Sequence, residues 1–129
     1  MLETGITGTI TKKVTQGLSA RELGSGELEV FATPAMIALI EETAWRSVAD
    51  RLDEGCGTVG TSVNITHTAA TPIGMDVTCK TTLVEIDRRR LVFEVGVFDE
   101  SGEIGKGTHE RFIVNNEKFQ AKADAKAGK

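Results

Sequence analysis

Residues 33–52, TPAMIALIEETAWRSVADRL, predict one long helix, and any fold of this chain has to bury one side of it. Thr33 suits the N-cap, because its hydroxyl can accept a hydrogen bond from an early unpaired N–H, and Pro34 suits the first helical position. At about 100° per residue an apolar stripe follows from the spacing. Its members are Ile37, Trp45, Val48 and Leu52.

Glu41 falls in the middle of this predicted apolar stripe. A carboxylate aimed at a protein core is costly unless it is paired, protonated or facing a polar pocket. Glu41 is therefore the first candidate for a chemical role.

The rest of the chain reads as strands joined by short turns. Residues 5–14 and 58–68 are rich in β-branched side chains, and three further strands are predicted at 76–86, 91–98 and 103–114. Short links such as Asp-Glu-Ser-Gly at 99–102 favour antiparallel pairing. We therefore expect an α+β fold in which a sheet covers the helix, with one domain over residues 1–117 and a flexible Ala/Lys-rich tail over 118–129.

Two predicted strands carry polar side chains on faces that are otherwise apolar or small. Val63, Ile65 and His67 alternate onto one face, where a histidine is either a satisfied core residue or a functional group. The face of the last strand that includes Gly107 and Gly105 also presents His109 and Arg111. Because glycines let a ligand approach closely, both polar residues are candidates for substrate binding.

Composition excludes several functions. The formal net charge of −4 argues against a nucleic-acid partner, although the Arg88-Arg89-Arg90 run is either a solvated turn or a contact for a small anion. Two histidines without clustered ligands predict no metal site, and no cofactor is expected.

The same composition bears on location. The longest apolar run, at 34–40, is far shorter than the ~20 residues that span a bilayer, and the N-terminal residues do not resemble a signal peptide. Cys56 and Cys79 are isolated, as expected of free thiols in a reducing compartment. We expect a cytoplasmic protein without a membrane partner.

Five residues stand in short segments whose order and separations form a pattern: Thr33 in FATPAM, Glu41 in IEETA, Gly60 and His67 in VGTSVNITHTAATPIG, and Arg111 in GTHERFIV. In these residues the sequence resembles the fluoroacetyl-CoA thioesterase-like family of hotdog proteins. The resemblance implies a hotdog fold, in which a curled antiparallel sheet wraps one central helix, and a homodimer. It also implies an acyl-CoA substrate, a catalytic set of Thr33, Glu41 and His67, and a binding site that includes Gly60 and Arg111.

For such an enzyme we expect hydrolysis of a small or medium acyl-CoA thioester. Glu41 either activates water or attacks the carbonyl to form a mixed anhydride. His67 forms a hydrogen bond to the nucleophile or shuttles the proton, and Thr33 orients the reacting groups. The Gly60 N–H is a candidate donor to the oxyanion. Eight helical residues rise about 12 Å, so Thr33 and Glu41 of one helix cannot touch unless Thr33 leaves the helix or a second chain completes the site.

The family member that acts on fluoroacetyl-CoA has an aromatic gate ahead of the helix, whereas residues 17–30 contain no aromatic side chain. This difference predicts another acyl preference. Two alternatives to hydrolysis stay open. In one, a Glu41–Arg111 salt bridge is structural and the domain only binds acyl-CoA. In the other, the protein hydrates enoyl-CoA, although the Asp and His hydratase motif is missing.

Overall fold

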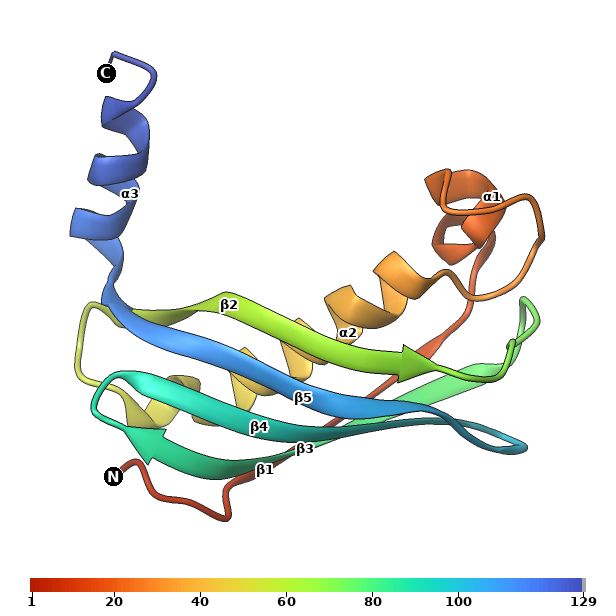
Figure 1. The fold of residues 1–129 in the computed structure, drawn as a ribbon, viewed down its shortest axis with the longest axis horizontal. Coiled ribbons are helices and arrows are strands. Elements are labelled where there is room, and N and C mark those ends of the chain that lie inside the picture. Colours follow the sequence, from red (N-terminus) through yellow and green to blue (C-terminus); the bar gives the residue numbers. More distant parts are fainter. Residues whose placement is uncertain (129) are drawn as a thin grey trace.

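A computed structural model describes residues 1–128. It has one five-stranded antiparallel sheet, in the order β1-β3-β4-β5-β2, curled around helix α2 (Figure 1). The strands are β1 Thr7–Lys13, β2 Cys56–His67, β3 Asp76–Asp87, β4 Arg90–Asp99 and β5 Gly102–Asn115, and the helices are α1 Ala20–Leu23, α2 Thr33–Val48 and α3 Asn116–Ala125, with short 3₁₀ turns at Gln16–Leu18 and Ala49–Arg51. The predicted α+β fold is confirmed.

The three-strand meander β3-β4-β5 follows from the turns that the sequence predicts. At the β4–β5 turn, Asp99 Oδ1 accepts hydrogen bonds from the N–H groups of Ser101, at 2.8 Å, and Gly102, at 3.2 Å. An aspartate that binds the backbone two and three residues ahead is typical of tight turns. Strands β1 and β2 lie at the two edges of the sheet, so each has one paired and one free edge.

The buried side of α2 differs from the predicted apolar stripe. The residues that face the sheet are Ala35, Met36, Leu39, Ile40, Thr43, Ala44 and Val48. Trp45 is 39% exposed, and Ile37 is half-buried. Glu41 therefore lies on the flank of the helix toward β2, beside the buried stripe and not in its middle. The prediction that Glu41 points into the core was therefore wrong. Its side chain is rotated about 100° around the helix axis, or roughly one residue, from the buried stripe.

Both ends of α2 also differ from their predictions. Ala32 is the N-cap and makes no side-chain capping hydrogen bond, while Thr33 is already helical. The Thr33 hydroxyl is therefore free for another partner. At the other end the α-helix stops at Val48 and continues as the 3₁₀ turn, so Leu52 lies outside it.

The core lies between α2 and the inward faces of β3 and β4. Alternate residues of these strands point toward the helix, as period-two strands require. The buried members are Val77, Cys79, Leu83, Leu91, Phe93, Val95 and Val97. This tightly packed layer fixes α2 against the sheet and so fixes every side chain that α2 presents on its flanks.

Helix α1 and the segment after it lie across the start of α2 (Figure 1). Ser19 caps α1 by accepting a hydrogen bond from the Glu22 N–H at 3.2 Å. The Phe31 N–H donates to the Thr71 carbonyl at 2.8 Å, which ties the entry of α2 to the loop after β2. The residues just before α2 form two isolated bridges, Val30 with Pro72 and Phe31 with Ser19.

Helix α3 leaves the end of β5 and stands away from the sheet (Figure 1). Asn115 caps it by accepting a hydrogen bond from the Lys118 N–H at 3.0 Å, and none of its residues is buried. The tail is helical up to Ala125 and adds nothing to the core. The boundary at residue 117 and the flexibility of the tail stay predictions.

Candidate active site

The first part of the site joins the start of α2 to the end of β2. Thr33 is the first helical residue and His67 is the last residue of its strand. Their side chains meet through a hydrogen bond of 2.8 Å between Thr33 Oγ1 and His67 Nδ1. The hydroxyl that was expected to cap the helix therefore binds the imidazole.

His67 has one ring nitrogen without a partner. Its Nε2 is buried and makes no hydrogen bond within residues 1–128. A buried polar atom without a hydrogen bond lowers the stability of the fold by ~1–3 kcal/mol. Such atoms are therefore usually satisfied by a ligand, a water molecule or another chain. The edge of the Phe31 ring packs against the imidazole, with centroids 6.3 Å apart. Burial lowers the pKa of His67, so the ring is neutral at neutral pH.

A small pocket of about 240 Å³ opens at this hydrogen-bonded pair. Apart from Thr33, Ser25, His67 and Thr68, its lining is apolar, with Ala20, Val30, Phe31, Ala69 and Ala70. A second groove of about 400 Å³ lies between α1 and α2, and its lining is mainly apolar apart from Lys12 and Glu42. Phe31 lines both spaces.

The second part of the site surrounds Arg111, whose side chain is 6% exposed. Its Nε donates to Thr58 Oγ1 at 2.7 Å and its Nη2 to the Thr58 carbonyl at 2.9 Å. Nη1 lies 3.4 Å from Glu41 Oε2. Burial lowers the pKa of Arg111 and Glu41 opposes this shift, and the guanidinium stays charged.

His109 helps to fix the position of Arg111 through a hydrogen bond to its guanidinium. It is fully buried, and its Nδ1 is 2.8 Å from the Ser62 carbonyl. A carbonyl only accepts, so Nδ1 carries the proton and Nε2 accepts from Arg111 Nη1 at 3.2 Å. Burial lowers the pKa of His109, which agrees with this neutral tautomer. The ring also stacks on Phe93, with centroids 6.2 Å apart.

Glu41 and Gly60 form the open end of this network. The Glu41 side chain is 42% exposed, and its Oε1 accepts no hydrogen bond from any described residue. A Cβ on Gly60 would lie 2.5 Å from Glu41 Oε2, which is too close for a real contact. A glycine at position 60 therefore leaves room for the carboxylate where α2 passes β2.

Within one chain the predicted residues gather in two groups and not in one. Glu41, Gly60, His109 and Arg111 form the first group, and Thr33 and His67 form the second. Gly60 and His67 lie seven residues apart on one strand, or about 23 Å. Thr33 and Glu41 are separated by about 12 Å of helix rise.

Sequence reasoning missed two contributors. Thr58 binds Arg111 through both its hydroxyl and its carbonyl, and Phe31 packs on His67. Thr58 lies two residues before Gly60 and thus on the same face of the strand, which was an available signal. Phe31 offered none, because its contact depends on how residues 19–31 fold back.

Two further properties of residues 1–128 bear on the site. No three His, Cys, Asp or Glu side chains come together there in a way that could hold a metal ion. Nor does any helix in that range combine the length and the apolar character needed to cross a bilayer.

Comparison with known proteins identifies the family. The model of the fluoroacetyl-CoA-specific thioesterase family matches residues 14–117. The fluoroacetyl-CoA thioesterase of Streptantibioticus cattleyicolor is 46% identical over 98 residues, which cover 76% of this chain and 70% of the relative.

Solved structures agree with this match. The fluoroacetyl-CoA thioesterase FlK has a TM-score of 0.92 and 38% identity, over 98% of each chain. A threonine-to-serine mutant of FlK in complex with acetyl-CoA has a TM-score of 0.92 and 37% identity, over 97% of this chain and 98% of that one. The predicted family and the hotdog architecture are both confirmed: the chain belongs to the fluoroacetyl-CoA-specific thioesterase family of hotdog proteins.

Proposed function

We propose that this protein is an acyl-CoA thioesterase, which hydrolyses a small or medium acyl-CoA thioester to the free acid and coenzyme A. The observation that carries the proposal concerns the two groups of site residues described above. Each group holds one polar atom of a reactive side chain that has no hydrogen-bond partner. Glu41 holds one oxygen free beside Gly60, and His67 holds one buried nitrogen without a partner. Membership in a family of thioesterases supports the same reaction.

The chemistry assigns the attack to Glu41. In one route its carboxylate takes a proton from water, and the hydroxide adds to the thioester carbonyl. In the other, a carboxylate oxygen attacks the carbonyl directly, and water then opens the mixed anhydride. In both routes the C–S bond breaks, the thiolate leaves and is protonated, and one water is consumed.

The other residues stabilise the charges that this reaction develops. The neutral His67 ring can both accept and return a proton, and Thr33 fixes its orientation through Nδ1. The Gly60 N–H is the proposed oxyanion donor, since no side chain keeps the substrate away. Arg111 positions Glu41, and His109 is a positioning residue for Arg111, because it is too deeply buried to touch substrate.

A homodimer would bring the two groups together. Strand β2 has a free edge next to Gly60, and free edges pair readily with a second strand. Trp45 and Ile37 are partly exposed apolar side chains on the same flank of α2 as Glu41. If the two-fold axis passes near the middle of β2, at Val63 and Asn64, antiparallel pairing places Gly60 and the adjacent Glu41 of one chain opposite the partner's His67, and two equivalent sites form.

The size of the substrate follows from the spaces near Thr33. A pocket of about 240 Å³ fits a short acyl group, and the mainly apolar groove that Phe31 also lines offers room for a longer one. Since residues 17–30 provide no aromatic gate, we do not propose selection for fluoroacetate.

We also propose a cytoplasmic location, with no membrane or nucleic-acid partner. Cys56 and Cys79 are both unpaired, as is usual in a reducing compartment. Burial raises the pKa of the Cys79 thiol to about 11, so this cysteine is inert. The net charge of −4 disfavours binding to phosphate backbones.

Release of free thiol from a panel of acyl-CoA esters, from acetyl to long-chain and aromatic, tests the proposed reaction. We expect stoichiometric release of coenzyme A and of the acid, with the highest kcat/KM for small or medium acyl groups. Loss of enoyl absorbance without thiol release would indicate a hydratase instead. Binding of acyl-CoA without either reaction would indicate a non-catalytic domain.

Replacing Gly60 by alanine is expected to lower kcat by about 10²-fold, because one oxyanion donor and the position of Glu41 are both disturbed. The new Cβ would lie 2.5 Å from Glu41 Oε2 and 3.3 Å from Arg111 Nη1. The partly exposed Glu41 side chain can move aside, so the melting temperature should change little.

The matched control is Gly96→Ala, a strand glycine whose added Cβ would meet the Phe98 ring at 3.1 Å. Its neighbours Val95 and Val97 face the core, so Gly96 lies on the outer face of the sheet, opposite to both groups. It should retain the parent kcat. Equal loss of rate in both variants would contradict the role given to Gly60.

A further inference from the structure

The turn between β3 and β4 is formed by Arg88 and Arg89 and is held in one conformation. Asp87 pairs with Arg90 across the hairpin, and the Ile113 N–H of β5 donates to the Arg89 carbonyl at 2.8 Å. Arg88 has a φ of 59°, in the left-handed region that side chains other than glycine seldom adopt. A two-residue hairpin turn favours a positive φ at its first central residue, so the hairpin itself accounts for this conformation.

The three consecutive arginines are not equivalent. Arg90 is engaged by Glu85 and by Glu110, each at 2.8 Å. Arg88 and Arg89 are exposed, and neither forms an ion pair or a side-chain hydrogen bond with any other residue of the range 1–128. Two uncompensated guanidinium groups therefore stand together in a chain whose net charge is −4.

An aromatic side chain adjoins these two arginines. Phe112 is 41% exposed and, together with Asp87 and the three arginines, lines a surface hollow of about 630 Å³. Three arginines and one carboxylate line the hollow itself, and the two carboxylates that balance Arg90, Glu85 and Glu110, are not among its lining residues. Guanidinium groups bind phosphates through paired N–H donors, and an exposed aromatic face stacks on a base. The combination is suited to a phosphorylated nucleotide.

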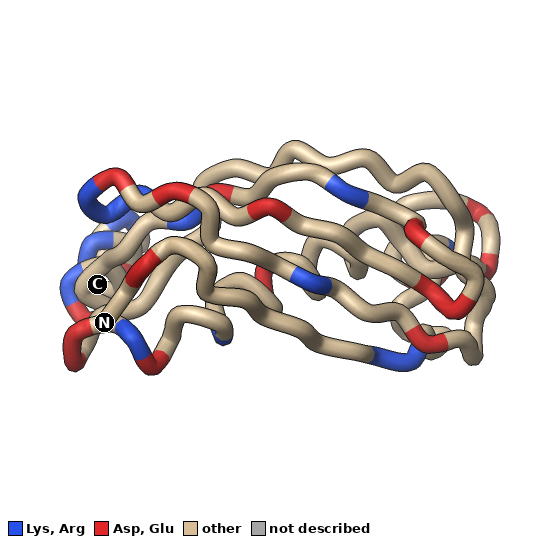
Figure 2. Tube along the Cα trace, turned by 90° about the horizontal axis from the view of Figure 1, so that it is seen from below, with Lys and Arg blue, Asp and Glu red and all other residues tan. Residues whose placement is uncertain are grey.

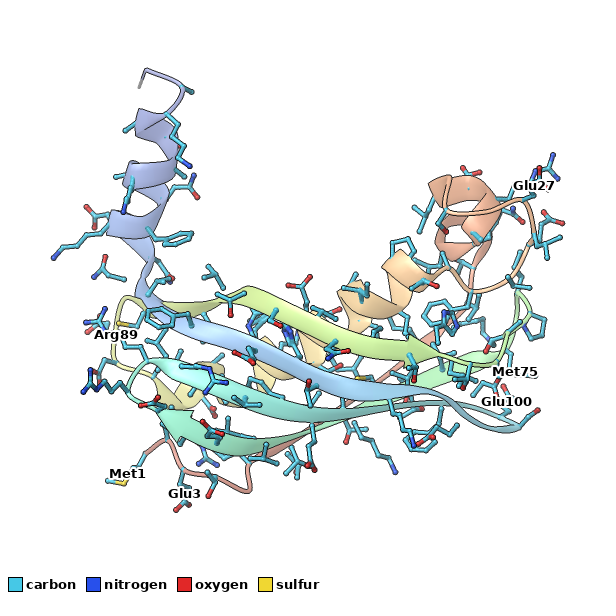
Figure 3. All side chains as sticks on the ribbon, viewed as in Figure 1. Met1, Glu3, Glu27, Met75, Arg89 and Glu100 are labelled. Carbon is cyan, nitrogen blue, oxygen red and sulfur yellow. The ribbon has the colours of Figure 1, made fainter. Side chains whose placement is uncertain are left out.

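The hollow lies near one of the two groups of site residues. Phe112 follows Arg111, the residue that contacts Glu41, and Ile113, which Arg89 binds, is only about 7 Å farther along β5. Figure 3 places Arg89 at the end of the sheet where α3 begins, whereas Glu27, Met75 and Glu100 mark the opposite end. Charged residues of both signs are spread along the strands between (Figure 2).

We infer that the hollow formed by Arg88, Arg89 and Phe112 binds the 3′-phospho-ADP part of the coenzyme A thioester. The inference rests on the proposed function and locates the nucleotide on the chain that supplies Glu41. The arginines hold the phosphates and Phe112 stacks on the adenine. Arg111 contacts Glu41 of α2, whereas its neighbour Phe112 is exposed on the other face of the sheet, so the proposal requires the flexible pantetheine arm to pass around the end of the sheet to reach Glu41.

The test compares the double variant Arg88→Ser/Arg89→Ser with Lys80→Ser/Lys106→Ser, which removes the same charge from exposed positions elsewhere on the sheet. Each is assayed with three thioesters of one acyl group, carried by coenzyme A, by 3′-dephospho-coenzyme A and by pantetheine. The arginine variant should raise KM for acyl-CoA by about 10-fold or more, since bonds to charged groups are strong, while kcat stays within about twofold.

The pantetheine thioester lacks the nucleotide, so its KM should not change in the arginine variant. The ester of 3′-dephospho-coenzyme A should show a smaller increase than acyl-CoA. Phe112→Leu should raise KM for both nucleotide-bearing esters by about 3- to 10-fold, because one stacking contact is lost. An equal rise for the pantetheine ester, or an equal rise in the lysine control, would overturn the inference.

A binding measurement separates this inference from the proposed reaction. Calorimetry with 3′,5′-ADP should detect binding to the parent protein and to Lys80→Ser/Lys106→Ser, and at least 10-fold weaker binding to the arginine variant. This result stands even if no thioester is hydrolysed. If 3′,5′-ADP fails to bind the parent, or binds both double variants equally, the hollow is not the nucleotide site.

Discussion

Glu41→Gln is expected to lower kcat by about 10³-fold without unfolding the protein, since acid–base and nucleophilic groups typically contribute 10²- to 10⁴-fold. The glutamine carbonyl can still accept the hydrogen bond that Arg111 Nη1 makes at 3.4 Å. The neutral amide can neither take a proton from water nor attack the thioester. Retention of structure with loss of rate is therefore the signature of a chemical role.

The neighbouring residue provides the control. Glu42 lies on the same helix, and its carboxylate pairs with Lys12 at 2.8 Å and with Arg46 at 2.9 Å. These two cations lower the pKa of Glu42, so it is fully ionised at neutral pH. Glu42→Gln makes the same chemical change and removes surface ion pairs worth at most about 1 kcal/mol each. With a short acyl-CoA, which does not need the groove that Glu42 lines, it should keep kcat within twofold.

Thiol release and circular dichroism, measured on both variants, decide between the two views of Glu41. If Glu41→Gln keeps more than a tenth of the parent kcat, the carboxylate serves as a partner of Arg111 and not as a catalyst. The protein would then match the alternative in which the domain binds acyl-CoA without hydrolysing it.

Local sequence signals were sufficient for most of the fold. Pro34 marked the start of α2, and the polar turn after Asp99 marked the hairpin that joins β4 to β5. Both depend on contacts between residues close in sequence. The exact buried face of α2 was harder to predict, because Trp45 and Val48 are equally apolar and only packing against the sheet decides which one is covered.

The sequence was sufficient to name candidate residues of the site, but not to predict which residues they contact. Alternation along β2 singled out His67, and the helical spacing singled out Glu41. Their partners depend on long-range register: Gly60 pairs with Arg111, and an irregularity between Gly60 and Ser62 shifts the strand. The alternation within a strand predicts which face of the sheet a residue occupies. It does not predict which residue of another strand, about fifty positions away, lies opposite it.

A mixed dimer of Glu41→Gln and His67→Ala chains is expected to recover about half of the parent activity per dimer, although each variant alone is nearly inactive. In the proposed two-fold dimer each site takes Glu41 from one chain and His67 from the other. One site of the mixed dimer then carries both substitutions, and the other carries neither. Two affinity tags allow the mixed dimer to be purified and its thiol release measured.

Placing the same two substitutions on one chain gives the decisive comparison. A dimer of the Glu41→Gln/His67→Ala double variant with a parent chain contains the same residues overall, yet each of its sites lacks one of the two groups. It should therefore be as inactive as the single variants. If the site were formed within one chain, this dimer would keep about half of the activity and the first mixed dimer would have none. Because the two arrangements predict opposite results from protein of equal composition, differences in stability between them cannot produce the expected pattern.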